Sequence, residues 1–128
     1  MNPVQRISSG SSFESVAGYS RAVVDEAYIH VSGTTGFDYA KMTIAEDALT
    51  QTHQTFANLE AALAQAGASL ADVVRVRYYL TDGSLFERLA PVFGQYLGQA
   101  RPAATAIVCG LIDPRMKIEI EVTARRPR

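Results

Sequence analysis

The stretch QTHQTFANLEAALAQAGASLADVVRVRYYLTD, residues 51–82, predicts a helix that leads directly into a strand. The helix belongs to residues 45–66, where apolar side chains recur at helical spacing and Gly67 is placed to cap the end. The stripe consists of Ala48, Leu49, Thr52, Phe56, Leu59, Leu63 and Ala66. We therefore expect a long amphipathic helix that covers one face of a sheet.

The strand, VVRVRYYLTD over residues 73–82, has two different faces because its side chains alternate. The apolar face comprises Val74, Val76, Tyr78 and Leu80. The opposite face carries Arg75, Arg77 and Tyr79. We expect the first face to pack under the helices and the second to point towards another subunit.

Further elements are predicted on both sides of this stretch. Residues 20–33, SRAVVDEAYIHVSG, are typical of a hairpin that closes around Asp25–Glu26, and a polar loop follows. A second helix is expected near residues 85–97, where Pro91 either kinks it or marks the first turn of its main part. Two last strands, residues 103–109 and 116–124, are expected to form a hairpin through GLIDPR.

This order, β-β-α-β-α-β-β, predicts an α+β fold, a two-layer sandwich in which both helices cover one face of the sheet. The other face carries aromatic and charged side chains, so we expect subunits to pack against it. A chain of 128 residues suits a single domain, residues 1–128, with a ligand cleft shared between subunits.

The composition argues against several partners. The formal net charge of −1, from 12 basic and 13 acidic residues, provides no general field to attract nucleic acid. No segment approaches the roughly 20 apolar residues of a membrane span, and the N-terminus lacks the apolar segment of a secretory signal, so a cytoplasmic protein is expected. One cysteine and two histidines without ligand spacing predict no metal site.

Four segments, in their order and spacing, resemble the Rid family, formerly named for YjgF, UK114 or liver perchloric-acid-soluble protein. They are GYSRAV, YIHVSGTTG, the stretch quoted first, and RPAATAIVCGLIDPRMKIEIEVTA, and they extend over nearly the whole chain. The resemblance implies a chorismate-mutase-like fold and a homotrimer with its sheets facing inward and three clefts at the subunit boundaries. It also implies hydrolysis of reactive enamines and imines, such as 2-aminoacrylate, to 2-oxo acids and ammonia without a cofactor.

The resemblance further implies which residues form the cleft. The family's aromatic residue corresponds to Tyr19, its backbone turn to Ser32 and Gly33, and its acidic residue to Glu119, which would orient or activate water. Thr34 stands where a glutamine often follows the turn. Tyr19 has an alternative role as an interface aromatic. Residues 32–34 offer backbone N–H groups to an anion, although a plain strand-to-loop turn has the same sequence.

Two positions depart from the family and predict a divergent member. The substrate-binding arginine falls at Ala104, which Thr105 follows in the same stretch, and an asparagine of the second helix falls at Ala90. An arginine clamps a carboxylate with two charge-assisted hydrogen bonds, and alanine cannot, so ordinary amino-acid imines are expected to be poor ligands. Arg77 is the best-placed replacement in the sequence, with a structural ion pair across the trimer as the alternative role.

Three functions remain in view. The first is hydrolysis of an imine or enamine by Glu119 and water, with a substrate carboxylate held by Arg77, by backbone amides, or not at all. The second is a non-catalytic trimer that binds a small ligand or regulates, because the two alanines make the cleft more apolar. The third, an endoribonuclease or translation inhibitor, is disfavoured by the near-neutral charge.

Overall fold

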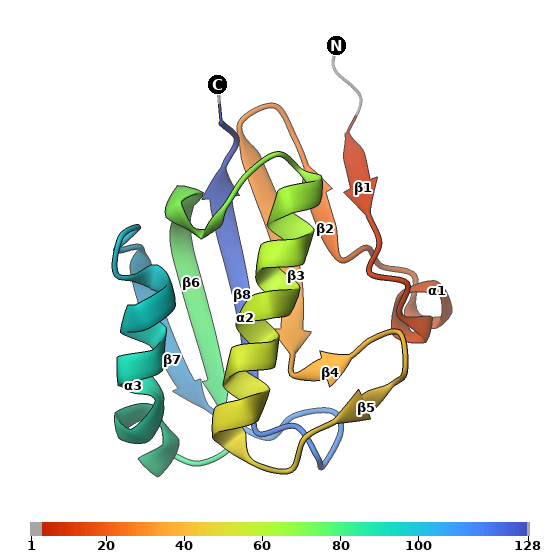
Figure 1. The fold of residues 1–128 in the computed structure, drawn as a ribbon. Coiled ribbons are helices and arrows are strands. Elements are labelled where there is room, and N and C mark those ends of the chain that lie inside the picture. The colour runs from red at the N-terminus through yellow and green to blue at the C-terminus, as the bar shows by residue number, and fades with distance from the viewer. Residues whose placement is uncertain (1–3, 128) are drawn as a thin grey trace.

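The computed structural model describes residues 4–127, which form a six-stranded sheet with two long helices on one face (Figure 1). The strands are β1 (Gln5–Ile7), β2 (Ala22–Val24), β3 (Tyr28–Thr35), β4 (Phe37–Asp38), β5 (Thr43–Ile44), β6 (Val73–Leu80), β7 (Ala103–Val108) and β8 (Ile118–Arg125). The helices are α1 (Ser12–Ala17), α2 (Ala48–Gln65) and α3 (Ser84–Leu97), with a 3₁₀ turn at Leu70–Asp72. The predicted α+β class, with α2 and α3 layered on one sheet face, is confirmed.

Strand β8 lies inside the sheet, whereas the sequence predicted a hairpin of the last two strands. The order is β1-β2-β3-β8-β6-β7, with β8 antiparallel to both β3 and β6 and β7 parallel to β6. The crossover through α3 returns the chain parallel to β6, which places β7 at the edge. The buried residues of β8 alternate with half-buried polar ones, which suits a place beneath the helices. The predicted hairpin is therefore wrong.

The predicted order of seven elements also lacks four short ones. Residues 34–43, expected to form a polar loop, contain the end of β3 and the β4–β5 hairpin. Helix α1 begins after Ser11, whose side chain accepts a hydrogen bond from Phe13 N, and ends at Gly18 with a left-handed φ of 77°. The spacing of Ser11 and Glu14 is that of a capping box, so the sequence did contain a signal for this helix.

The main core lies between the sheet and the two long helices. Phe56, Leu59 and Leu63 of α2 are completely buried, as the predicted stripe requires. Leu49 departs from that prediction because it is 46% exposed, and Ala62 is buried on the inner face of the helix.

Strand β6 keeps its two predicted faces except at its beginning. After the first residues of the strand, the side chains that face the helices are buried; they are Val76, Tyr78 and Leu80. Near Val73 the register with β8 shifts, so Val73 is buried and Val74 is exposed, the reverse of the simple alternation.

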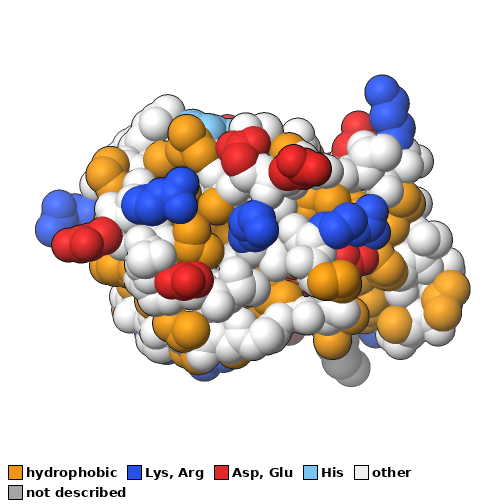
Figure 2. All heavy atoms as spheres, turned by 90° about the horizontal axis from the view of Figure 1, so that it is seen from below, with side chains coloured by type: hydrophobic (Ala, Val, Ile, Leu, Met, Phe, Trp, Pro, Cys, Tyr) orange, Lys and Arg blue, Asp and Glu red, His pale blue; other side chains and the backbone are white. Residues whose placement is uncertain are grey.

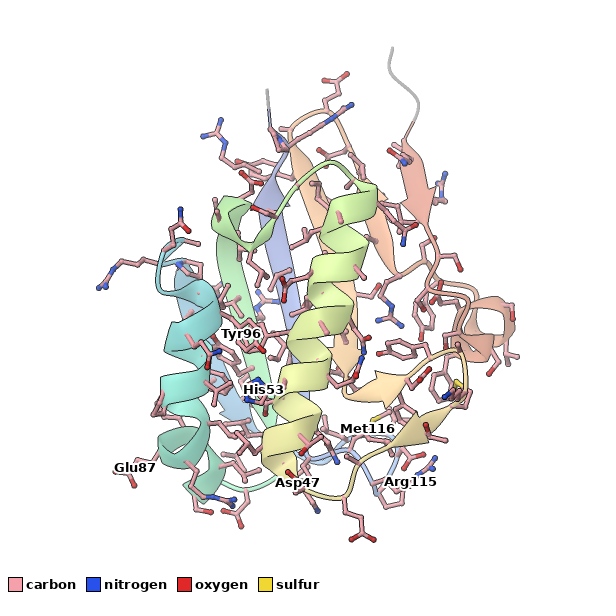
Figure 3. All side chains as sticks on the ribbon, in the orientation of Figure 1. Asp47, His53, Glu87, Tyr96, Arg115 and Met116 are labelled. Atoms are coloured by element: carbon pink, nitrogen blue, oxygen red, sulfur yellow. The ribbon has the colours of Figure 1, made fainter. Side chains whose placement is uncertain are left out.

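Aromatic contacts join α2 to α3. Tyr96 stacks on Phe56 with ring centroids 4.3 Å apart, and its hydroxyl lies 2.7 Å from His53 Nδ1. Figure 3 shows His53 and Tyr96 side by side between the two helices. Pro91 lies inside α3, so it does not mark the beginning of the helix.

Two features are absent from residues 4–127. None of the helices in that range has the length and apolar character needed to cross a bilayer. The same residues contain no group of three or more His, Cys, Asp or Glu side chains arranged to hold a metal ion.

Gln51 connects α2 to the loop before β8 through a completely buried side chain. Its Nε2 donates to Ala45 O and Arg115 O, both at 2.8 Å, and its Oε1 accepts from Lys117 N at 2.9 Å. The turn after β3 packs on the same place, because a Cβ on Gly36 would lie 2.7 Å from the Gln51 backbone. Gln51 therefore holds residues 115–117 against the beginning of α2.

We expect Gln51→Leu to lower the free energy of unfolding by about 2–4 kcal/mol, because three backbone groups lose the partner that the buried Gln51 side chain provides. Urea unfolding followed by circular dichroism measures the change. Gln65→Leu, on the exposed end of the same helix, is the matched control and should change stability by less than about 0.5 kcal/mol. Equal effects of the two substitutions would contradict the role assigned to Gln51.

Candidate functional site

A cavity of about 450 Å³ lies where α1, β3, β8 and the loop before β8 meet. Its volume is within the range of small-molecule sites. Figure 3 shows Arg115 and Met116 in that loop, on the side of the β4–β5 hairpin. The lining residues are Ser12, Phe13, Val16, Ala17, Tyr19, Arg21, Gly33, Thr35, Tyr39, Ile112, Met116 and Glu119. Most of the lining is apolar or aromatic, and the ionisable groups are few.

Glu119 on β8 brings a carboxylate into this cavity. The side chain is half-buried, and its carboxylate makes no ion pair with any residue in the range 4–127. It lies against Gly33 on β3 so closely that a Cβ there would be 2.5 Å from Glu119 Oε2. Burial raises the pKa of Glu119, the negative charge of Glu121 adds to this, and Arg21 partly opposes it.

Arg21 is the cationic side chain that lines this cavity together with Glu119, and it is 2% exposed. Its Nη1 donates to Gly33 O at 2.7 Å and to Thr34 Oγ1 at 3.1 Å. The guanidinium stacks over Tyr39, 4.5 Å from the ring centroid. Its Nε has no hydrogen-bond partner among the described residues.

Glu14 neutralises the charge of Arg21. Glu14 Oε2 lies 3.7 Å from Arg21 Nε, and both side chains are almost completely buried. Burial alone would raise the pKa of Glu14, but hydrogen bonds from the backbone and hydroxyl of Ser9, together with Arg21, bring that pKa below its usual range. The pair is therefore a buried, charge-balanced contact between α1 and the residue that precedes β2.

Tyr19 is at the rim of the cavity and is 39% exposed. Burial raises the pKa of its hydroxyl, and nearby Arg21 lowers it by a smaller amount. The Arg21 guanidinium carbon lies 5.8 Å from the centre of the Tyr19 ring. Tyr19, Gly33 and Glu119, three of the residues assigned by resemblance, are thus together in one cavity.

The side chains of Ser32 and Thr34 are engaged in the protein itself. Ser32 Oγ donates to Ser20 O at 2.6 Å, and Thr34 Oγ1 donates to Ser32 O at 2.7 Å. Thr34 is completely buried, and the Ser32 N–H already donates to Arg21 O. Residues 32–34, where the resemblance implied a turn, lie within β3 at a shift in its register with β8. Their hydrogen bonds hold this irregularity and leave the Thr34 hydroxyl without access to a ligand.

Arg77 and Thr105 lie on the open face of the sheet. Arg77 is opposite Glu121 on β8, with Nη1 3.8 Å from Glu121 Oε1, and the Tyr79 hydroxyl also donates to that carboxylate. Thr105 Oγ1 accepts from Arg75 Nη2 at 2.9 Å. In this chain Arg77 is therefore part of an ion pair and does not line the cavity of Glu119.

Ala104 lies on the opposite face of the sheet from Arg77. It pairs with Val76, whose side chain is buried under the helices, whereas Arg77 pairs with Thr105. Within one chain Arg77 therefore cannot take the place of a guanidinium at position 104. Ala104 lines a groove of about 300 Å³ between β7 and α3, together with Tyr78, Phe86, Ala90, Phe93, Thr105 and Ala106.

The sequence patterns did not predict two features of the cavity: the buried Arg21–Glu14 ion pair, and the apolar side chains of Val16 and Ile112 at its rim. Arg21 stands within GYSRAV, just before an apolar strand, but nothing nearby in the sequence indicates its partner. Val16 and Ile112, 88% and 95% exposed, flank the cavity and are separated by almost the whole chain. Only the capping-box spacing of Ser11 and Glu14 offered a local signal for this region.

Comparisons with known proteins agree with this architecture. The family model described as Endoribonuclease L-PSP matches residues 9–126. The structure of Rv2704 from Mycobacterium tuberculosis, a member of the YjgF/YER057c/UK114 family, has a TM-score of 0.87 and 41% identity, over 96% of this chain and 99% of that one. RidA from an Antarctic Psychrobacter has a TM-score of 0.85 and 34% identity, over 94% and 98% of the chains.

A curated relative extends the similarity to archaea. A RutC family protein of Pyrococcus abyssi is 34% identical over 110 residues, which cover 85% of this chain and 87% of the relative. The fold and cavity thus define an α+β protein of the YjgF type. The chain belongs to the Rid/YjgF family, as the resemblance in its sequence indicated.

We expect Gly33→Ala to displace the Glu119 carboxylate and to lower the free energy of unfolding by about 1 kcal/mol, because the obstructing atoms are the end of a flexible side chain. In a Glu119→Ala background the obstructing atoms are gone, so the same substitution should cost less than half as much. A double-mutant cycle measured by urea unfolding gives the coupling. Equal costs in the two backgrounds would show that Glu119 does not lie against Gly33.

Proposed function

We propose that this protein hydrolyses reactive imines or enamines in clefts built around Glu119. The observation that carries the proposal is a half-buried carboxylate, without an ion pair in the described chain, beside Tyr19 in an apolar cavity. A carboxylate with a raised pKa suits a group that accepts a proton in one step and returns it in the next.

The proposed reaction needs only water and this one carboxylate. The substrate is the protonated imine. Glu119 accepts a proton from water as the water oxygen bonds to the iminium carbon, and the electrons of the C=N bond move to nitrogen to give a neutral carbinolamine. The protonated Glu119 then gives that proton to the carbinolamine nitrogen. The C–N bond breaks as the hydroxyl proton passes to Glu119 and the carbonyl forms, so that an iminium ion plus water yields a carbonyl compound, ammonia or an amine, and one proton.

A second copy of the chain is proposed to complete the cleft. Five of the six residues of β7 are exposed, and they include Ile107 and Val108 at 41% and 60%. Val16 and Ile112, at the cavity rim, are also exposed apolar side chains. The exposed apolar residues of β7 and those of the cavity rim lie at opposite edges of the sheet, and each set is typical of a surface that packs against another subunit. In the homotrimer that the family resemblance implies, the Ala104 groove of one copy would face the Glu119 cavity of the next.

A non-catalytic ligand-binding or regulatory trimer is the second candidate. The Ala104 groove contains no charged side chain, so it supplies neither a clamp nor a proton donor. An apolar cleft of this kind suits binding without chemistry.

On the face of residues 4–127 that is seen from below, the charges do not favour the endoribonuclease activity that gives the family model its description. Figure 2 shows Lys and Arg side chains interspersed with Asp and Glu on the face seen from below. The formal net charge of the chain is −1, whereas phosphate contacts supply most non-specific affinity for RNA.

We expect light scattering coupled to size exclusion to give a mass near three times the 13.9 kDa of one chain. Ile107→Glu should lower that mass, because it introduces a charge at the exposed apolar edge. Glu60→Gln, on the exposed side of α2, is the control and should leave the mass unchanged. A monomer in the unsubstituted protein would contradict the shared cleft.

We expect the protein to accelerate the conversion of enzymatically generated imines to carbonyl compounds, measured as a lower yield of semicarbazide adducts. Glu119→Gln should reduce this rate by about 100-fold or more, because it removes the proton-accepting group. Glu60→Gln should stay within about twofold of the unsubstituted protein. No acceleration over a panel of imines that includes ones with and without a carboxylate would reject catalysis and favour the ligand-binding alternative.

A further inference from the structure

The charge balance of the Glu119 cavity points to a class of ligand. Arg21 is the one cationic side chain among the described residues that line the cavity. Its charge faces Glu14 at 3.7 Å, and both hydrogen bonds of its Nη1 go to the protein. A ligand carboxylate that paired with Arg21 would have to compete with a buried carboxylate already fixed by Ser9.

Glu119 has no comparable partner. The neighbouring acidic residue on the same strand face, Glu121, is held by Arg77 and by the Tyr79 hydroxyl. The carboxylate of Glu119 lies instead beside Gly33 and apolar side chains, where solvent screening is weak. An anionic ligand there is repelled, and a cationic or hydrogen-bond-donating ligand is attracted.

A second copy of the chain would not reverse this balance through its Ala104 groove. That groove is lined by aromatic side chains, alanines and Thr105, without a charged group. The neighbouring groove that also touches Ala104 does contain Arg101, an exposed residue with a left-handed φ of 48°. Arg101 is therefore the residue whose contribution the experiment has to exclude.

We propose that the Glu119 cavity selects carboxylate-free compounds with an apolar body and a cationic or neutral nitrogen, such as iminium ions of small aliphatic aldehydes or ketones. This inference rests on the proposed function for the reaction, but it concerns only the charge of the ligand. The nitrogen lies towards Glu119, and the hydrocarbon part packs on Phe13, Val16 and Met116.

The test uses three probes of nearly equal shape at pH 7: 3-methylbutylamine, 3-methylbutanamide and 3-methylbutanoate. Binding to the full-length protein is followed by NMR chemical shifts of residues around the cavity. The amine is expected to bind at least about tenfold more tightly than the carboxylate, with the amide between them. Glu119→Gln should remove the preference, whereas Glu121→Gln, on the same strand face, should retain it.

Two further variants test whether a cationic side chain outside the cavity binds the carboxylate of the probe. Ala104→Arg is expected to strengthen binding of 3-methylbutanoate by about tenfold or more, because it adds a guanidinium. Arg101→Gln is expected to leave all three affinities unchanged. If the unsubstituted protein binds the carboxylate as tightly as the amine, the inference is wrong, and loss of carboxylate binding in Arg101→Gln would then identify Arg101 as the cation responsible.

Imine hydrolysis separates this inference from the proposed function. Faster turnover of amino-acid imines than of imines without a carboxylate would overturn the ligand class and leave catalysis standing. The amine preference without turnover of any imine would reject catalysis and leave the ligand class standing.

Discussion

The antiparallel pairing of β8 with β3 on one side and with β6 on the other is the interaction on which the other layers depend. It joins the N-terminal strands β1–β3 to the β6–α3–β7 unit, so that α2 and α3 share one continuous core. Alternate residues of β8 serve both faces: Ile118 and Ile120 are completely buried beneath the helices, and Glu119 points the other way. The same alternation that builds the core therefore presents the carboxylate of the site.

The chemistry of Glu119 depends on what its neighbours lack. Gly33 has no side chain, so the carboxylate can lie directly against β3. The charge of Arg21, which lines the same cavity, is already balanced by Glu14, and the surrounding apolar groups cannot solvate a charge. The site thus combines a neutralised cation with a carboxylate that has no counter-ion in the described chain, an arrangement that favours exchange of a proton or contact with a positive ligand.

Local patterns in the sequence were sufficient for much of the fold. The stripe of α2, the two faces of β6 and the alternation around Glu119 are all set by residues close together in the chain. The place of β8 was not predictable in this way, because it depends on which strand edges remain open after α3 has crossed the sheet. The Arg21–Glu14 pair was missed for a similar reason. The two residues matter because both side chains are buried as an ion pair, and which side chains are buried depends on tertiary packing. The family resemblance named Tyr19, Gly33 and Glu119, which line one cavity, but the opposite orientations of Arg77 and Ala104 required the strand register.

The position of β8 also matters while the chain is being made. Strands β3 and β6 leave the ribosome before Ile118–Arg125 does. Until β8 has emerged, the edge of each strand that pairs with β8 has unpaired backbone N–H and C=O groups. A polypeptide truncated before residue 118 would contain β1–β3 and the β6–β7 pair without the strand that joins them. Protection of the growing chain by a chaperone is therefore valuable until β8 has emerged, and loss of β8 separates β1–β3 from the β6–β7 pair.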